Sequence, residues 1–133
     1  MNADSARKRT ARGVLLRERR RQALVNAKVF RVLRQQRDDM KTARQFLHFA
    51  YFRTKTARDA FLRKVKRLGY GLIANTLPFS KDELPHGVEF ARVDAMDATA
   101  LAGSCAELSL LASRLGGEYD GWEVEVERKS RKR

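Results

Sequence analysis

The 133-residue sequence contains few of the residues that cross-link chains or carry catalysis: one cysteine, two histidines and two prolines. A single cysteine excludes an intramolecular disulfide, which fits a reducing compartment. Neither histidine stands at a metal-ligand spacing from a cysteine or a carboxylate. Phosphate-cradling glycine loops, G-x-S-x-G motifs and metalloprotease helices are also absent. The sequence therefore predicts no catalytic site, no metal, no cofactor and no enzymatic activity.

Long apolar runs are missing as well, and none approaches the length needed to span a bilayer. The first residues are rich in arginine and poor in acids, as in organelle transit peptides. They lack the serine enrichment of such peptides, however, and they lead into a helical pattern. We therefore expect a cytoplasmic protein, with a transit peptide as the alternative.

Acidic residues are scarce at both ends of the chain, whose formal charge is +13. Residues 1–45 carry 14 Lys/Arg against 4 Asp/Glu, residues 46–127 carry 10 against 12, and residues 128–133 carry 5 against none. Cationic ends usually meet phosphate, an anionic membrane surface or an acidic protein, although they can also be solvated tails that aid solubility. The candidate RNA-binding residues are Arg7, Lys8, Arg9, Arg12, Arg19, Arg20, Arg21, Arg128, Lys129, Arg131, Lys132 and Arg133.

The first third of the chain is predicted to hold a disordered basic tail and one helix. Residues 1–13 are small, polar and cationic without apolar periodicity, which indicates a disordered tail. From Val14 to about Arg37 there is neither proline nor glycine, and a stripe at helical spacing predicts a basic helix. The stripe consists of Leu16, Ala23, Ala27, Phe30 and Leu33. Asp38 and Asp39 then begin a connector, so that residues 14–45 form a basic helix and its connector.

Residues 46–127 alternate between strand and helix patterns. Strands are expected at 46–52, 70–74 and 88–93, and a fourth at 122–127 after a tight turn at Asp120-Gly121. Helices are expected at about 56–68, where Thr56 to Asp59 resembles a capping box, and from a cap at Asp97 to Leu115. Residues 75–85 form a loop, and residues 128–133 form a basic C-terminal tail. The order predicts an α+β fold, the ferredoxin-like βαββαβ sandwich, with an extra N-terminal helix as the only spare element to cover the open sheet face.

Alternation in the last strand places Trp122, Val124 and Val126 toward the core and Glu123, Glu125 and Glu127 toward the open face. Carboxylates there would repel phosphate, which disfavours RNA binding on the sheet. His86 to Val93 also lacks the basic, glycine and aromatic pattern of RNA-recognition motifs. His48 is interpreted as a hydrogen-bonded sheet residue rather than a ligand, and Cys105 as an inert buried thiol on an apolar helix stripe.

Several short segments are similar to a known family. They are Asp38-Asp39, Arg44, His48, Tyr51-Phe52, Gly69-Tyr70 and Tyr119-Asp120-Gly121-Trp122. On these residues, and from about residue 38 to 127, the chain resembles the ribonuclease E inhibitors called regulator of ribonuclease activity B. The resemblance implies a small ferredoxin-like protein without enzymatic activity, which binds the endoribonuclease and lowers its action on messenger RNA. The basic ends depart from the acidic character of that family.

Two functional hypotheses follow. The first is a non-enzymatic regulator that binds and inhibits an RNA-processing endoribonuclease through a contact surface made of Asp38, Asp39, Arg44, Tyr119, Asp120, Gly121 and Trp122. For this surface the alternative is that Trp122 is only core and Asp120-Gly121 only a turn. The second hypothesis is an RNA- or ribosome-binding protein whose basic N- and C-terminal segments clamp phosphates.

Overall fold

The computed structural model describes residues 3–75 and 83–128, with side chains from residue 11 onward. In chain order these ranges contain α1 (Ala3–Gln35), β1 (Arg44–Phe52), α2 (Lys55–Arg67), β2 (Gly71–Ala74), β3 (His86–Asp94), α3 (Ala98–Arg114) and β4 (Gly117–Glu123). After the N-terminal helix, the order is the predicted strand, helix, strand, strand, helix, strand. Most of the predicted loop at 75–85 lies outside the described residues.

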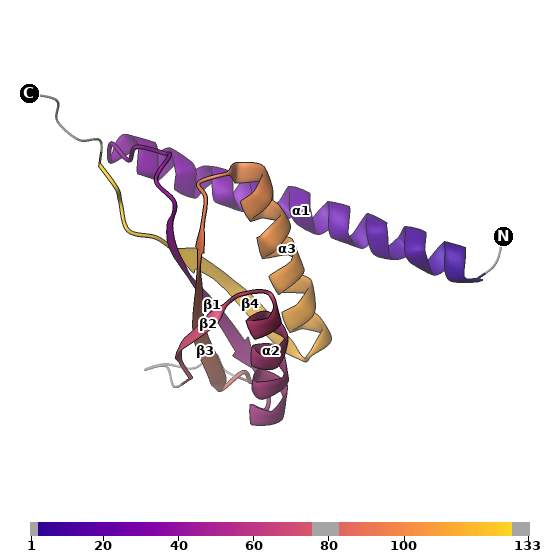
Figure 1. Ribbon diagram of the computed structural model, residues 1–133. Coiled ribbons are helices and arrows are strands. Elements are labelled where there is room, and N and C mark those ends of the chain that lie inside the picture. The colour runs from indigo at the N-terminus through magenta and orange to yellow at the C-terminus, as the bar shows by residue number, and fades with distance from the viewer. Residues whose placement is uncertain (1–2, 76–82, 129–133) are drawn as a thin grey trace, which may run out of the picture.

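The four strands form one antiparallel sheet in the order β2-β3-β1-β4. The helices α2 and α3 lie together on one side of this sheet (Figure 1). Two crossovers that leave the first and third strands central define the ferredoxin-like α+β sandwich, so the predicted fold class is confirmed. The helix α2 begins two residues earlier than expected from its cap, because Oγ1 of Thr54, not Thr56, accepts the hydrogen bond from the backbone N–H of Ala57 at 3.1 Å.

The N-terminal helix is longer than predicted. It begins at Ala3 rather than at Val14, so the prediction of a disordered tail over residues 1–13 is wrong from Ala3 onward. The physical reason is that residues 3–35 contain no proline and one glycine, Gly13, while alanine and arginine are good helix formers. One glycine costs about 1 kcal/mol, which is not enough to end a helix of this length.

The helix α1 packs against α3 and does not cover the second face of the sheet. In Figure 1 it crosses α3 and its N-terminal half continues past the body of the protein. Its buried side chains are Phe30 and Leu33, as expected, together with Gln22 and Asn26. The other three stripe residues, Leu16, Ala23 and Ala27, are exposed. The buried face of α1 is therefore rotated relative to the predicted stripe and carries the side-chain amides of Gln22 and Asn26. Both amides form hydrogen bonds to other side chains.

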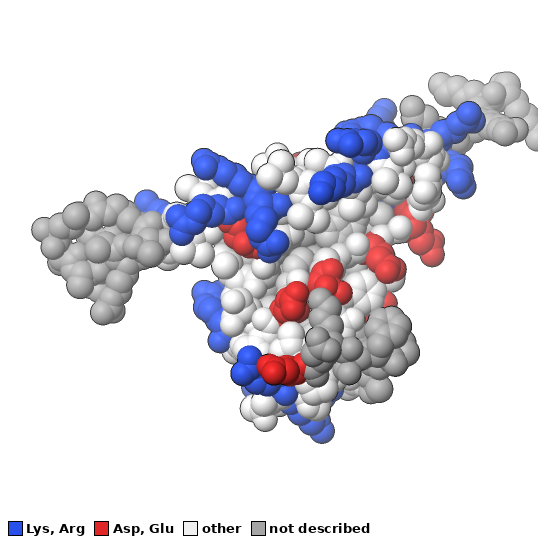
Figure 2. Space-filling view, turned by 180° about the vertical axis from the view of Figure 1, so that it is seen from behind, with Lys and Arg blue, Asp and Glu red and all other residues white. Residues whose placement is uncertain are grey.

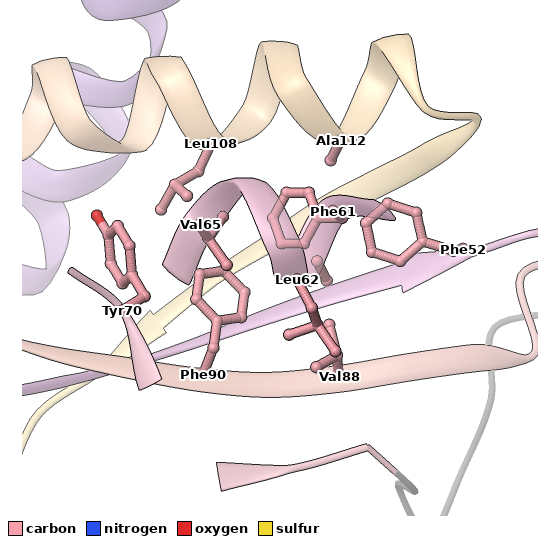
Figure 3. Packing of buried hydrophobic residues seen from close by; sticks show 10 residues of the cluster. Phe52, Phe61, Leu62, Val65, Tyr70, Val88, Phe90, Leu108 and Ala112 are labelled. Carbon is pink, nitrogen blue, oxygen red and sulfur yellow. The ribbon is translucent and has the colours of Figure 1, made fainter. Parts of the chain in front are cut away.

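The buried residues form two clusters rather than the single core that the strand pattern suggests. The first joins α2 and α3 to the sheet through Phe52, Phe61, Val65, Phe90 and Leu108 (Figure 3). The second joins α1 to α3 and the β1–β4 side of the sheet; it contains Phe30, Leu33, Phe46, Leu101 and Cys105, with Trp122, Val124 and Val126 packed against it. The N-terminal helix thus completes a second core.

The strand β4 differs from the prediction. It spans Gly117–Glu123, so Asp120 and Gly121 lie inside the strand rather than in a turn before it. Tyr119 pairs with Ala50 and Gly121 pairs with Phe49, which leaves Asp120 as the extra residue of a bulge. Gly121 has a φ of 108°, a conformation that glycine adopts without strain. Asp120-Gly121, predicted to form a turn, therefore forms a bend within the edge strand β4. Residues 124–127 continue outside the sheet.

Candidate protein-binding site beside a buried ion pair

Asp38 and Arg44 form a buried ion pair at the start of the sheet, with 3% and 7% of their surfaces exposed. The Asp38 carboxylate accepts hydrogen bonds from Nη1 of Arg44 at 2.5 Å and from Nη2 at 3.0 Å. It also accepts from the backbone N–H groups of Met40 at 2.7 Å and Glu127 at 3.0 Å. Arg44 in turn donates to the carbonyl of Glu125 at 2.9 Å. The pair thus ties the connector to the segment after β4.

Asp39 organises the exposed side of the same connector. Its backbone N–H donates to the carbonyl of Glu127 at 2.7 Å, and its carboxylate accepts from the backbone N–H groups of Lys41 at 2.9 Å and Thr42 at 3.0 Å. The Thr42 hydroxyl donates to the same carboxylate, and Arg44 Nη2 lies 3.3 Å from it. We call Asp38, Asp39 and Arg44, together with residues 125–128, the clamp.

The charges of the clamp persist at neutral pH. Hydrogen bonds from Arg44 are the main cause that holds the pKa of Asp38 below its ordinary value of 3.8. Hydrogen bonds from the Thr42 side chain, and then from backbone N–H groups, lower the pKa of Asp39 to about 2. Hydrogen bonding to Asp38 likewise raises the pKa of Arg44. Because carboxylate and guanidinium stay ionised, the clamp is an electrostatic contact as well as a hydrogen-bonded one.

Beside the clamp lies a hollow of about 450 Å³ between the start of β1 and the segment after β4. Its walls include Leu47 and Val124, and its rim carries the three exposed carboxylates of Glu123, Glu125 and Glu127. We call it the acidic hollow. In the view from behind, Asp and Glu side chains gather over the middle of the body, while Lys and Arg side chains lie along its upper edge and again at its lower end (Figure 2). Such a hollow attracts cationic groups and repels phosphate.

The structure brings together part of the predicted contact surface. Asp38, Asp39 and Arg44 contact the segment 125–128 that follows β4, and Asp38 and Arg44 are buried within the clamp. Asp120 is exposed on the β4 bulge beside Gly121. The rings of Tyr119 and Trp122 instead pack into the second cluster. Of the predicted surface, Asp39 is therefore partly exposed and Asp120 is exposed, and the exposed glutamates of the hollow were not part of the prediction.

Trp122 and Tyr119 belong to a buried polar chain that links α1, α3 and the sheet. The Trp122 Nε1–H donates to Oδ1 of Asn26 at 2.8 Å, and Nδ2 of Asn26 lies 4.0 Å from Sγ of Cys105. The Tyr119 hydroxyl lies 3.5 Å from that sulfur and 2.8 Å from Nδ1 of His48. The other nitrogen of His48, Nε2, has no hydrogen-bond partner within the described part of the chain.

The titratable residues of this buried polar chain, His48, Cys105 and Tyr119, are neutral at physiological pH. Burial lowers the pKa of His48 to about 3 and raises the pKa of Cys105. Burial also raises the pKa of Tyr119 well above 10.0. A buried thiol with a raised pKa is a poor nucleophile. The buried polar chain therefore fixes the position of α1 against α3 and β4 through Asn26. The predictions of a hydrogen-bonded His48 and a buried Cys105 are confirmed.

Sequence reasoning did not identify Asn26, which accepts the hydrogen bond from the indole N–H of Trp122. A signal was available, because Gln22, Asn26 and Phe30 stand four residues apart and so share one helix face.

Within the described residues, no three His, Cys, Asp or Glu side chains lie together in a way that could hold a metal ion. In the same ranges, no helix combines the length and apolar character that crossing a bilayer requires.

The predicted RNA-binding residues fall into two groups. Those with described side chains are exposed; they are Arg12, Arg19, Arg20 and Arg21 on α1 and Arg128 at the end of the clamp. Arg7, Lys8 and Arg9 belong to the α1 backbone, but their side chains lie outside the described part, as do Lys129, Arg131, Lys132 and Arg133 entirely. The basic ends thus include an ordered helical surface.

The fold and the site define a small ferredoxin-like protein in which a buried ion pair supports an acidic surface hollow. The family model described as regulator of ribonuclease activity B matches residues 24–124, and the chain belongs to this family. The predicted resemblance is confirmed, and the family implies regulation of ribonuclease activity. The chain has no significant match among curated proteins. The matched range leaves out residues 1–23, which include Arg19, Arg20 and Arg21.

Proposed function

We propose that this protein binds an RNA-processing endoribonuclease in the cytoplasm and lowers its activity without catalysing a reaction itself. The observation that carries the proposal is the acidic hollow beside the clamp, in a chain of the ribonuclease-regulator family. Ribonucleases hold RNA through Lys and Arg side chains that neutralise phosphates. A hollow rimmed by carboxylates offers those side chains a competing partner.

Glu123, Glu125 and Glu127 make the electrostatic contact in this proposal, and Leu47 and Val124 supply an apolar floor. Alternate residues of an extended chain lie about 6–7 Å apart, so the three carboxylates form a spaced row rather than a point charge. Complementary charges of this kind mainly set the association rate and the choice of partner.

The clamp residues act in two ways. Asp38 and Arg44 are buried and hold the row of glutamates in place, since they bind the backbone of Glu125 and Glu127 directly. Asp39 and Asp120 are at the surface and contact the partner. Tyr119 and Trp122 position β4 from inside the second cluster, and Gly121 shapes the bulge that presents Asp120.

The test measures cleavage of a fluorogenic RNA by a purified ribonuclease E-type enzyme with increasing amounts of the full-length protein. The variant Glu125→Gln/Glu127→Gln removes two charges of the hollow, and Glu83→Gln/Glu89→Gln removes two charges that line neither the hollow nor the groove between α1 and α3. Each exposed charge contact contributes up to about 1 kcal/mol, so we expect the loss of two contacts to weaken inhibition by the hollow variant up to about 30-fold, while the control inhibits normally. A full-length protein that leaves cleavage unchanged, or equal inhibition by both variants, would refute the proposal.

A second candidate function is binding of RNA or ribosomes through the basic ends. It is supported by the exposed cations of α1, with Arg12, Arg19, Arg20 and Arg21 among them. Removal of residues 1–37 is not a suitable test, because Phe30 and Leu33 belong to the second cluster and their loss would damage the fold. Point substitutions in the full-length chain are therefore needed.

A further inference from the structure

A groove runs along α1 where this helix meets the start of α3. Its wider part, about 570 Å³, is lined by Arg19, Arg20 and Ala23 of α1 and by Ala98, Gly103 and Ser104 of α3, among others. A narrower part of about 200 Å³ shares Ala23 and Ala98 with it and continues past Ala27 and Phe30 to Arg34. We call the two parts together the α1–α3 groove.

The groove combines an apolar floor with a basic rim. Ala23, Ala27, Ala98 and Ala102 give small side chains that leave the floor open, and Thr99 and Ser104 add hydroxyl groups to its wall. Arg19 and Arg20 stand at one end and Arg34 at the other. None of these three arginines forms an ion pair with another residue of the described chain, so their charges remain available.

We propose that the α1–α3 groove binds single-stranded RNA, with a base on the apolar floor and the flanking phosphates on Arg19, Arg20 and Arg34. This inference deepens the second candidate function and is independent of ribonuclease inhibition. Arg20 and Arg34 lie 14 positions apart on α1, which corresponds to about 21 Å of helix. Proteins that bind single strands occupy at least about four nucleotides, which a groove of this length can hold.

The surroundings of the groove favour RNA over other occupants. Exposed Arg17, Arg21, Lys28 and Arg31 extend the basic surface around α1. Such a field attracts polyanions and raises their association rate. An unstacked base can enter a concave apolar site, whereas a duplex keeps its bases stacked and paired. Glu107 also lines the groove, where its carboxylate can accept a hydrogen bond from a base amino group. The same charge repels phosphates, so the phosphates are assigned to Arg19, Arg20 and Arg34.

The experiment measures fluorescence anisotropy of a fluorescein-labelled 12-nucleotide oligo(A) with the full-length protein at several salt concentrations. The groove-filling variant is Ala23→Phe, with Ala27→Phe as a second one, since both alanines are exposed and their replacement leaves the core intact. The rim variant is Arg19→Ala/Arg20→Ala. The matched control is Arg63→Ala/Lys66→Ala, which removes two exposed cations from α2. Thermal melts check that all variants are folded.

Groove filling should weaken oligo(A) binding about fivefold or more, because the base is displaced from the apolar floor and loses its burial there, while the salt dependence stays unchanged. The rim variant should make the log–log salt slope shallower by about 0.7 for each arginine that contacts a phosphate. The α2 control should bind like the unaltered protein, and a 12-base-pair RNA duplex should compete poorly.

Three results would overturn the inference, and they separate it from the candidate functions. If the unaltered protein does not bind oligo(A) at low salt, RNA binding fails altogether and the groove with it. If binding occurs but the groove and rim variants match the α2 control, RNA binds elsewhere on the basic ends. If the groove variants keep RNA binding but lose inhibition of the ribonuclease, the groove is a protein interface.

Discussion

Replacement of Asp38 by Asn tests whether the clamp holds the connector to the segment after β4. The carboxylate receives hydrogen bonds from Arg44, Met40 and Glu127, and Asn can accept on only one oxygen. The Arg44 side chain, 5% exposed, would keep a buried charge, balanced by the Asp39 carboxylate at 3.3 Å and by the charge of Glu127. Removal of one partner of a buried pair costs roughly 3–5 kcal/mol. Because Asp39 remains, we expect a loss near the lower end of that range.

The measurement is denaturant unfolding, in which the midpoint should fall while the slope m stays constant. Arg21→Ala is the control, because it breaks the Glu18–Arg21 pair, in which the arginine side chain is 60% exposed, and should change the free energy of unfolding by about 0–1 kcal/mol. The double variant Asp38→Asn/Arg44→Met should lose less than the two single losses combined, since Met leaves no charge buried. A loss below about 1 kcal/mol for Asp38→Asn, or strict additivity, would show that the clamp does not stabilise the fold as argued.

Three further predictions concern the polar chain. Burial lowers the pKa of His48 from 6.5 to about 3, so the unfolded chain binds the extra proton and stability falls by up to about 1.4 kcal/mol per pH unit below about pH 6.5. His48→Phe should flatten this dependence between pH 6 and 5, above the carboxylate range. The same titration of His86→Gln checks that the slope belongs to His48, and an unchanged slope in His48→Phe would contradict the assignment. Cys105, fully buried with a raised pKa, should react with a thiol reagent far more slowly than in the unfolded chain, and equal rates would place it at the surface. Trp122→Ala should cost about 3 kcal/mol by removal of the ring from Phe30 and Phe46, whereas Trp122→Phe should cost about 1 kcal/mol through the lost hydrogen bond to Asn26; losses near zero for both would show that the ring is dispensable.

The sequence by itself determined the order of strands and helices and, in the segment after Gly121, which side chains turn toward the core. These properties are local, because side chains alternate along a strand and repeat every 3.6 residues along a helix whatever lies around them. The burial of Cys105 and the exposure of Glu123, Glu125 and Glu127 followed from these two periods. The family was also identifiable, since its recurring residues are short segments read directly from the chain.

Only the tertiary structure decided which face of α1 is buried, because Gln22 and Asn26 become acceptable core residues only where Trp122 and Glu18 supply hydrogen bonds. The tertiary structure also decided that Asp120-Gly121 forms a bulge rather than a turn. The reason is that β4 pairs with β1 on both sides of this dipeptide, so the strand continues through it. The clamp joins Asp38 to Glu127 across 89 positions of the chain. No local sequence pattern predicts such a contact, because it forms only when the fold brings these two distant segments together.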